Sequence, residues 1–499
     1  MGNTYPESGK DIKEVFRNAA TILFGNRFKS EQTLYEYLIE FLLIFVSSKS
    51  EDSDEGKMMF HDPNNTELRY WCEPRIGLKR FIFFDKAKKT GNASVDYDAY
   101  NQIIKILKKR ISDEIEEEEK QEIIEGIQDL LHGYAVVLKK RSWCAQAVLP
   151  ICPEMVFCEA MPNLKTRNKL NWPVDNAKNI DNSFDFNKRN FLARGGEVFY
   201  LHILQALQNQ PEKRHKLEEL LRHLLKEENN KLSSICNFVQ KSWEKEMGLD
   251  SKELRQKVLL SYIPKDAYVE CGKYCVDELI NYLSSELPII NKIEVLAQGI
   301  MFQIMRMLSW RVDNYLETDR KVWIVDMLDN SKSGIKKIAA ENYTEIENRF
   351  CEAINRVLKD KNSENPVKEL NDAIKTSVDL FRIRGKEIKC IVPNNGQYTR
   401  FTLSEDIIRF LVLSLIPAKK KITLSMFLEK LYTHFGIVIG PDEYRESINS
   451  VNKLAPSLAN LFADNLNAFQ DFLKSTGFLR ELSDATSIVV NPYNHVKEE

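Results

Sequence analysis

The sequence predicts a mainly α protein, α+β overall, that is divided into several domains. Apolar residues recur with the 3.6-residue period of a helix over most of the stretch from 211 to 359. Patterns typical of strands are confined to a small mixed region near the N-terminus and to the last hundred or so residues. A length of 499 residues is enough for two to four domains with substantial cores.

The first 175 residues predict a helical or mixed α+β domain. Helical spacing appears in 10–24, 30–46 and 100–131, whereas 69–72 and 80–85 are typical of two strands. An Asn- and Asp-rich stretch, 176–190, follows and predicts a linker or a long surface loop.

Residues 191–380 predict a helical domain. Breaks at Gly248, Pro264, Pro288 and Pro366 separate its helices. The helices are expected at 211–226, 231–247, 251–262, 267–287, 288–316 and 334–359.

Residues 381–499 predict a β-hairpin followed by a small helical module. Asn394, Asn395 and Gly396 form a strong turn signal between strands at 388–392 and 398–402. Ser404 is a candidate N-cap for the next helix, and Gly436 is a candidate C-cap for the one after it. Two further helices and a terminal hairpin, with its turn at 483–486, complete the module.

This order of helices ending in a hairpin, over residues 404–493, resembles the winged-helix superfamily. The resemblance places a recognition helix at 466–475 and the tip of a wing at 483–486. In that family the recognition helix commonly enters the major groove of DNA. The side chains expected to point outward from this helix are Asn465, Asn467, Gln470, Asp471, Lys474 and Ser475. Their summed charge is nearly neutral, which leaves both DNA contact and protein contact open.

If the module does contact DNA, its basic side chains are the ones that carry the charge to do so. They are Lys419, Lys420, Lys421, Lys474 and Arg480. All five are expected to be exposed, so that changing them should leave the fold of the module intact.

The sequence predicts no metal site and no cofactor. His132, Cys144, Cys152 and Cys158 are separated by twelve, eight and six residues, whereas structural zinc usually takes ligands from a tight pair two to four residues apart. Cys271 and Cys275 share a helix face, but no second pair completes a site.

A metal-dependent nuclease is the alternative. Asp85, Asp96 and Asp98, with Lys86 and Lys88 nearby, would have to supply its carboxylates and its lysine. No acid-x-Lys triplet stands on a neighbouring strand in the order that such a site requires.

Composition predicts a cytoplasmic protein with no membrane segment. The net charge of −2 argues against a bulk polyanion binder, although local basic patches remain open. Nine cysteines are spread along the chain without a secreted framework, and no basic-then-apolar leader precedes residue 13. The longest apolar run, 41–46, is far too short to span a bilayer.

These observations together predict a non-catalytic scaffold or adaptor subunit of a larger prokaryotic assembly that acts on DNA, such as a restriction or anti-phage defence system. Its expected partners are other protein subunits, for example a helicase, a translocase or a nuclease, and double-stranded DNA. The alternative stays open that the chain is itself a metal-dependent nuclease or another DNA-processing enzyme with an unrecognised active site.

Overall fold

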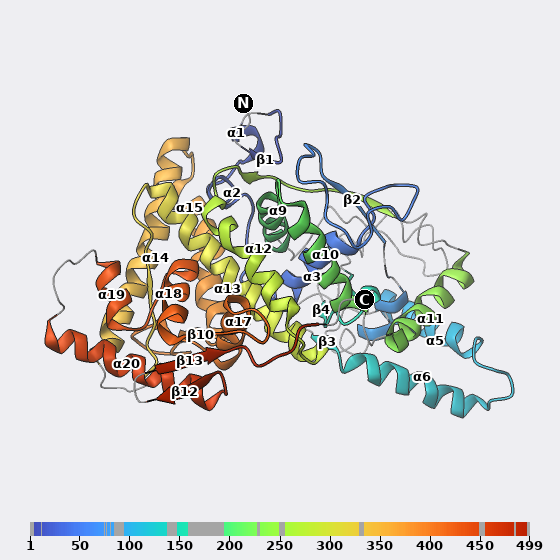
Figure 1. Ribbon diagram of the computed structural model, residues 1–499. Coiled ribbons are helices and arrows are strands. Elements are labelled where there is room, and N and C mark those ends of the chain that lie inside the picture. The colour runs from blue at the N-terminus through green and yellow to red at the C-terminus, as the bar shows by residue number, and fades with distance from the viewer. Residues whose placement is uncertain are drawn as a thin grey trace. The chain divides into compact units, whose positions relative to one another are not determined.

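Most of the residues that the computed structural model describes are helical, which confirms the predicted mainly α fold (Figure 1). The structure describes residues 4–10, 12–73, 75, 77–79, 81–83, 94–136, 147–157, 194–226, 230–248, 255–328, 334–448, 455–483 and 486–496. The chain forms a larger unit, 1–30 with 201–220 and 261–499, and a smaller unit, 31–200 with 221–260. The predicted linker at 176–190 lies outside the described residues, and the division into 1–175, 191–380 and 381–499 stays a prediction.

The smaller unit combines helices with short paired strands. Helix α3 begins with a capping box, in which the hydroxyl of Thr33 accepts from the backbone N–H of Glu36 and the Glu36 carboxylate accepts from the backbone N–H of Thr33. The described elements are α3 (Leu34–Val46), β2 (Arg69–Cys72), α5 (Ser94–Lys108), α6 (Glu117–His132), β3 (Ala135–Val136), β4 (Ala147–Val148), the short helix η2 (Pro153–Met155), α11 (Asn230–Met247) and β5 (Gln256–Leu259).

Two predicted elements of this unit are wrong. The strand expected at 80–85 is helical over its described part, 81–83, where three consecutive apolar side chains are buried in a core shared with α5 and α11. Within the helix expected at 251–262, of which 251–254 lie outside the described residues, Gln256–Leu259 instead form β5, which pairs antiparallel with β2. Burial alternates along β5, with Val258 buried between two exposed neighbours, as a half-covered strand requires.

The larger unit is built around the long helix α13 (Ile289–Leu316), most of which is buried. Close packing against α17 (Glu405–Leu415) requires a glycine at position 299, because a Cβ there would lie 2.1 Å from the ring of Phe410. The other described elements before residue 404 are β1 (Thr4–Tyr5), α1 (Ile12–Val15), α2 (Ala19–Phe24), β6 (Ile263–Pro264), α12 (Val269–Ser284), β7 (Trp323–Ile324), α14 (Gly334–Lys361), α15 (Pro366–Lys375), α16 (Val378–Glu387), β8 (Ile391–Val392) and β9 (Arg400–Phe401). Helices α9 (Gly195–Ala206) and α10 (Pro211–Lys226) contribute residues to both units.

The predicted hairpin before the terminal module is present as the antiparallel pair β8–β9. Its strands are shorter than the expected 388–392 and 398–402. The first begins only at Ile391, because 388–390 form the turn that ends α16, in which the N–H of Cys390 donates to the carbonyl of Gly385.

The helices and the terminal hairpin predicted for 404–493 are confirmed. Ser404 caps α17 by accepting from the backbone N–H of Ile407, and Gly436 ends α18 in the left-handed conformation. The remaining elements are β10 (Lys421–Thr423), α18 (Leu424–Phe435), β11 (Ile437–Val438), α19 (Pro441–Ser447), α20 (Pro456–Ser475), β12 (Leu479–Ser483) and β13 (Thr486–Val490). Strand β10 joins the hairpin to give a three-stranded antiparallel sheet in the order β10–β13–β12 (Figure 1).

None of the helices in the described part of the chain is both long enough and apolar enough to cross a membrane.

Candidate functional site

The five basic side chains proposed from the sequence are all exposed, as predicted. Lys419 and Lys420 form the turn between α17 and β10, and Lys421 is the first residue of β10. Lys474 lies in the last turn of α20, and Arg480 is the second residue of β12.

The turn before β10 is fixed by the backbone that follows the hairpin. Lys419 adopts a left-handed conformation with φ of 57°, and its N–H donates to the carbonyl of Tyr493 at 3.1 Å. The carbonyl of Lys420 accepts from the N–H of Asn491 at 3.0 Å. The turn is therefore held beside the end of β13, and it carries its lysines at the edge of the sheet.

The register of the sheet places Lys421 and Arg480 on one face. Thr423 is opposite Ile488, which is opposite Arg480, and directly opposite residues of an antiparallel sheet share a face. Lys421 is two residues before Thr423 on the same strand, so it belongs to this face too.

The second face of the sheet is the inner one. The row of Ile422, Val489 and Leu479 lies on it, and the last two of these side chains are buried. Lys421 and Arg480 therefore point outward, about 12 Å apart across two strand spacings and two residues along the strands.

Asn465 corrects the predicted outward face of α20. It is fully buried, because it lies three residues after Phe462 and four before Phe469, on the stripe that packs inward. Its side-chain amide donates to the carbonyls of Val325 at 2.8 Å and Ile439 at 3.0 Å, and its carbonyl oxygen accepts from the N–H of Met327 at 2.8 Å.

The exposed surface of α20 is acidic. Asp464, Asn467, Asp471 and Ser475 are exposed, and Gln470 is half-buried. The ammonium group of Lys474 lies 3.0 Å from both carboxylate oxygens of Glu481, so its charge is already compensated.

Lys419, Lys420, Lys421 and Arg480 form no ion pair with any carboxylate in the part of the chain that the structure describes. The turn before β10 and the outer face of the sheet therefore carry four described cations without an ion pair. We call these four residues the basic sheet face.

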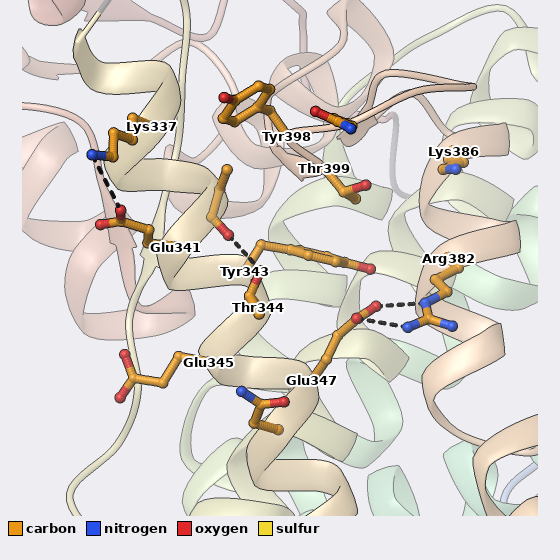
Figure 2. A pocket seen from close by; sticks show the side chains of 13 residues that line it. Lys337, Glu341, Tyr343, Thr344, Glu345, Glu347, Arg382, Lys386, Tyr398 and Thr399 are labelled. Carbon is orange, nitrogen blue, oxygen red and sulfur yellow. Dashed lines mark hydrogen bonds and ion pairs between the residues drawn. The ribbon is translucent and has the colours of Figure 1, made fainter.

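A groove between α14, α16 and the turn of the β8–β9 hairpin is a second candidate site, which the sequence analysis missed. It has a volume of about 710 Å³. Figure 2 shows Tyr343 reaching from α14 with its hydroxyl toward the Glu347 carboxylate and Arg382. Arg382 binds Glu347 through two hydrogen bonds of 2.7 Å, and burial raises the pKa of Tyr343 well above its usual value.

The walls of this groove carry both signs of charge. Its lining includes the cations Lys337, Arg382 and Lys386 and the carboxylates Glu341, Glu345 and Glu347. Such a balance does not favour an anion. Tyr398, with 52% of its surface exposed, stands at the hairpin side of the groove, where an aromatic side chain suits a protein contact (Figure 2).

A buried charge cluster joins three helices of the larger unit. Arg306 on α13 lies 2.8 Å from the carboxylate of Glu278 on α12, and both side chains are fully buried. Glu278 also accepts from Gln303 at 2.7 Å and lies 3.0 Å from the ring of His434 on α18. Burial acts to raise the pKa of Glu278, but Arg306 and His434 together outweigh it and hold the pKa below its usual value.

The same guanidinium also caps α18. Arg306 donates to the carbonyl of His434 at 2.8 Å, and Arg320 donates to the carbonyls of Thr433 and Tyr432. The last carbonyls of a helix have no partner inside the helix, so these contacts fix the end of α18 against α13.

The cysteine and carboxylate candidates do not assemble into a site among the described residues. Within that part of the chain, no three His, Cys, Asp or Glu side chains are grouped to hold a metal ion. Cys271 and Cys275 are buried, and burial raises the pKa of both thiols, to about 12 for Cys271. A raised pKa keeps a thiol protonated and unreactive.

Several of the residues weighed for a zinc site or for the nuclease alternative are not covered by the structure. The residues that lie outside the described part of the chain are Cys144, Cys158, Asp85, Lys86 and Lys88. Asp96 and Asp98 lie on helix α5, where the nuclease alternative would need a strand.

Comparison with family models, with curated proteins and with solved structures finds no match for this chain, so its function has to be inferred from its own residues.

Proposed function

We propose that residues 404–493 form a winged-helix module, and that this chain is a non-catalytic scaffold subunit of a larger assembly that acts on DNA. The module would contact duplex DNA, and the helical surface of the larger unit would bind protein partners. The observation that carries this proposal is the basic sheet face, which presents two cations without an ion pair on the outer face of the sheet and two more in the adjoining turn, in a protein whose net charge is −2.

The order of elements supports the winged-helix assignment. The order along the chain is helix α17, strand β10, helices α18, α19 and α20, and the hairpin β12–β13. Strand β10 pairs with the hairpin as a third strand. The sequence resemblance covered the helices and the hairpin, and β10 adds a further feature consistent with it.

The surroundings of the module support a scaffold role. Strand β11 pairs with β7 in parallel, and Asn465 binds the backbone on both sides of this pair. The module is therefore built into the core of the larger unit and does not hang from a linker, so a bound duplex would be held rigidly to that unit.

The groove beside Tyr398 is a described surface suited to a protein partner, because it combines an exposed aromatic ring with polar groups of both charges. Membership of a restriction or anti-phage system stays a prediction.

Reversing all five proposed charges should abolish most duplex binding. The variant carries Glu at positions 419, 420, 421, 474 and 480, and we expect the salt dependence of its residual affinity to flatten by about 0.9 per lost phosphate contact. Fluorescence anisotropy with a labelled duplex at several salt concentrations measures both quantities.

The matched control changes the net charge by the same amount at positions elsewhere on the larger unit. It replaces the exposed lysines at 337, 359, 368, 375 and 389 by Glu. It should bind the duplex much more tightly than the first variant. Equal affinities of the two variants would show that only the overall charge matters, and absence of binding by the natural chain would refute the DNA contact.

A further inference from the structure

We infer that the module holds duplex DNA through the outer face of its three-stranded sheet, by its phosphates and without sequence selectivity, and that helix α20 does not enter the major groove. This inference rests on the proposed DNA contact. It follows from where the charges of the module are compensated and where they are not.

Helix α20 is a poor candidate for the major groove. Its exposed surface carries the carboxylates of Asp464 and Asp471, and both would approach the phosphates on entry. Its cation, Lys474, is held by Glu481 at 3.0 Å. Insertion would therefore bring repulsion on the exposed side of the helix and would also have to break an existing ion pair.

The outer face of the sheet has the opposite character. Glu481 is the one carboxylate on the described residues of β10, β12 and β13, and it is turned toward Lys474 on α20. No described carboxylate of these strands therefore opposes Lys421 and Arg480 on the outer face. Lys419 and Lys420 extend the positive charge from the adjoining turn.

The other side chains on the outer face of the sheet are the reason that we infer binding without sequence selectivity. Thr423, Ile488 and Val490 share the outer face with Lys421 and Arg480. Ile488 and Val490 are aliphatic and offer no hydrogen bond to the edge of a base, and Thr423 is short. Arginine can read a guanine, but we assign Arg480 to phosphate together with the lysines. Lysine contacts to phosphate fix position on a duplex without carrying sequence information.

The spacing of the charges also suits a backbone. Lys421 and Arg480 are two strands apart and offset by two residues along the strands, which separates them by about 12 Å, and both side chains are long and flexible. At this separation each cation can reach a different phosphate of the same duplex.

Two variants of the full chain test the inference. The sheet variant carries Gln at positions 419, 420, 421 and 480, and the helix variant carries Asn467→Ala, Gln470→Ala and Lys474→Gln. We expect the sheet variant to lose at least about ten-fold in affinity for a labelled duplex at low salt, and its salt slope should fall by about three to four. The affinity of the helix variant should stay within about two-fold of that of the natural chain, because α20 makes no contact with the duplex. Loss of the exposed Lys474–Glu481 pair should also cost little stability.

Each outcome decides between the alternatives. Two duplexes of unrelated sequence should bind the natural chain with equal affinity, within about two-fold.

Loss of binding in the helix variant with retention in the sheet variant would overturn the inference while leaving the proposed DNA contact intact. Natural binding that neither variant reduces would place the contact elsewhere, and no binding by the natural chain would overturn both. Unchanged thermal unfolding of the two variants checks that the module is still folded.

Discussion

Replacing Arg306 by Met should lower the free energy of unfolding of the larger unit by about 3–5 kcal/mol. The change removes the partner of a carboxylate that is fully buried, and an uncompensated buried charge is costly. Gln303 and His434 would remain beside Glu278, but neither supplies a permanent positive charge. Urea unfolding followed by circular dichroism measures the loss.

Arg382→Met is the matched control, because Arg382 also makes a close ion pair but its side chain is 49% exposed. It should cost less than about 1 kcal/mol. Adding Glu278→Leu to Arg306→Met should recover much of the loss, because a well-packed apolar pair often replaces a buried ion pair without penalty. An Arg306→Met variant as stable as the Arg382→Met variant would contradict the role given to the buried cluster.

The buried cluster also predicts a pH dependence. Because the folded pKa of Glu278 is lowered, its ionised form stabilises the folded state above the ordinary pKa of glutamate, and that contribution is lost as the pH falls through the lowered value. The natural chain should therefore lose stability on acidification below about pH 4.5 more steeply than the Glu278→Leu/Arg306→Met double variant. Equal slopes would show that other carboxylates account for the acid sensitivity.

Replacing Asn465 by Ala should cost about 3 kcal/mol or more. The change leaves three backbone groups without their partner, the carbonyls of Val325 and Ile439 and the N–H of Met327. A buried polar group that loses its hydrogen bond costs about 1–3 kcal/mol. Asn467→Ala, two residues along the same helix but exposed, should change the stability by less than about 0.5 kcal/mol. A loss below about 1 kcal/mol for Asn465→Ala would show that water takes over these contacts.

Local signals in the sequence predicted the elements of the C-terminal module well. Ser404 and Gly436 act at helix ends through their own backbone neighbourhood, so their roles can be predicted without knowing the fold. The hairpin at 483–486 is equally local. The exposure of Lys419, Lys420 and Lys421 was also predicted; the first two lie in the turn before β10 and the third begins that strand.

Features that depend on remote contacts could not be predicted in the same way. A short apolar run such as 81–83 shows no periodicity. A helical segment that is buried on several sides therefore has the same sequence pattern as a buried strand. Asn465 was assigned outward because it is polar, although its spacing from Phe462 and Phe469 places it on the buried stripe. The groove beside Tyr398 is formed by α14, α16 and the hairpin, whose mutual orientation is set by tertiary packing.

Lysine acetylation of the natural chain, with and without bound duplex, tests the central claim most directly. The full chain would be treated at low salt with a saturating duplex, and the modified positions would be read by mass spectrometry. We expect the duplex to protect Lys419, Lys420 and Lys421, whereas Lys474 on α20 should react equally in both samples. Protection of Lys474 with unchanged reactivity of the three sheet-edge lysines, or no protection of any of the four in a saturated complex, would contradict the account.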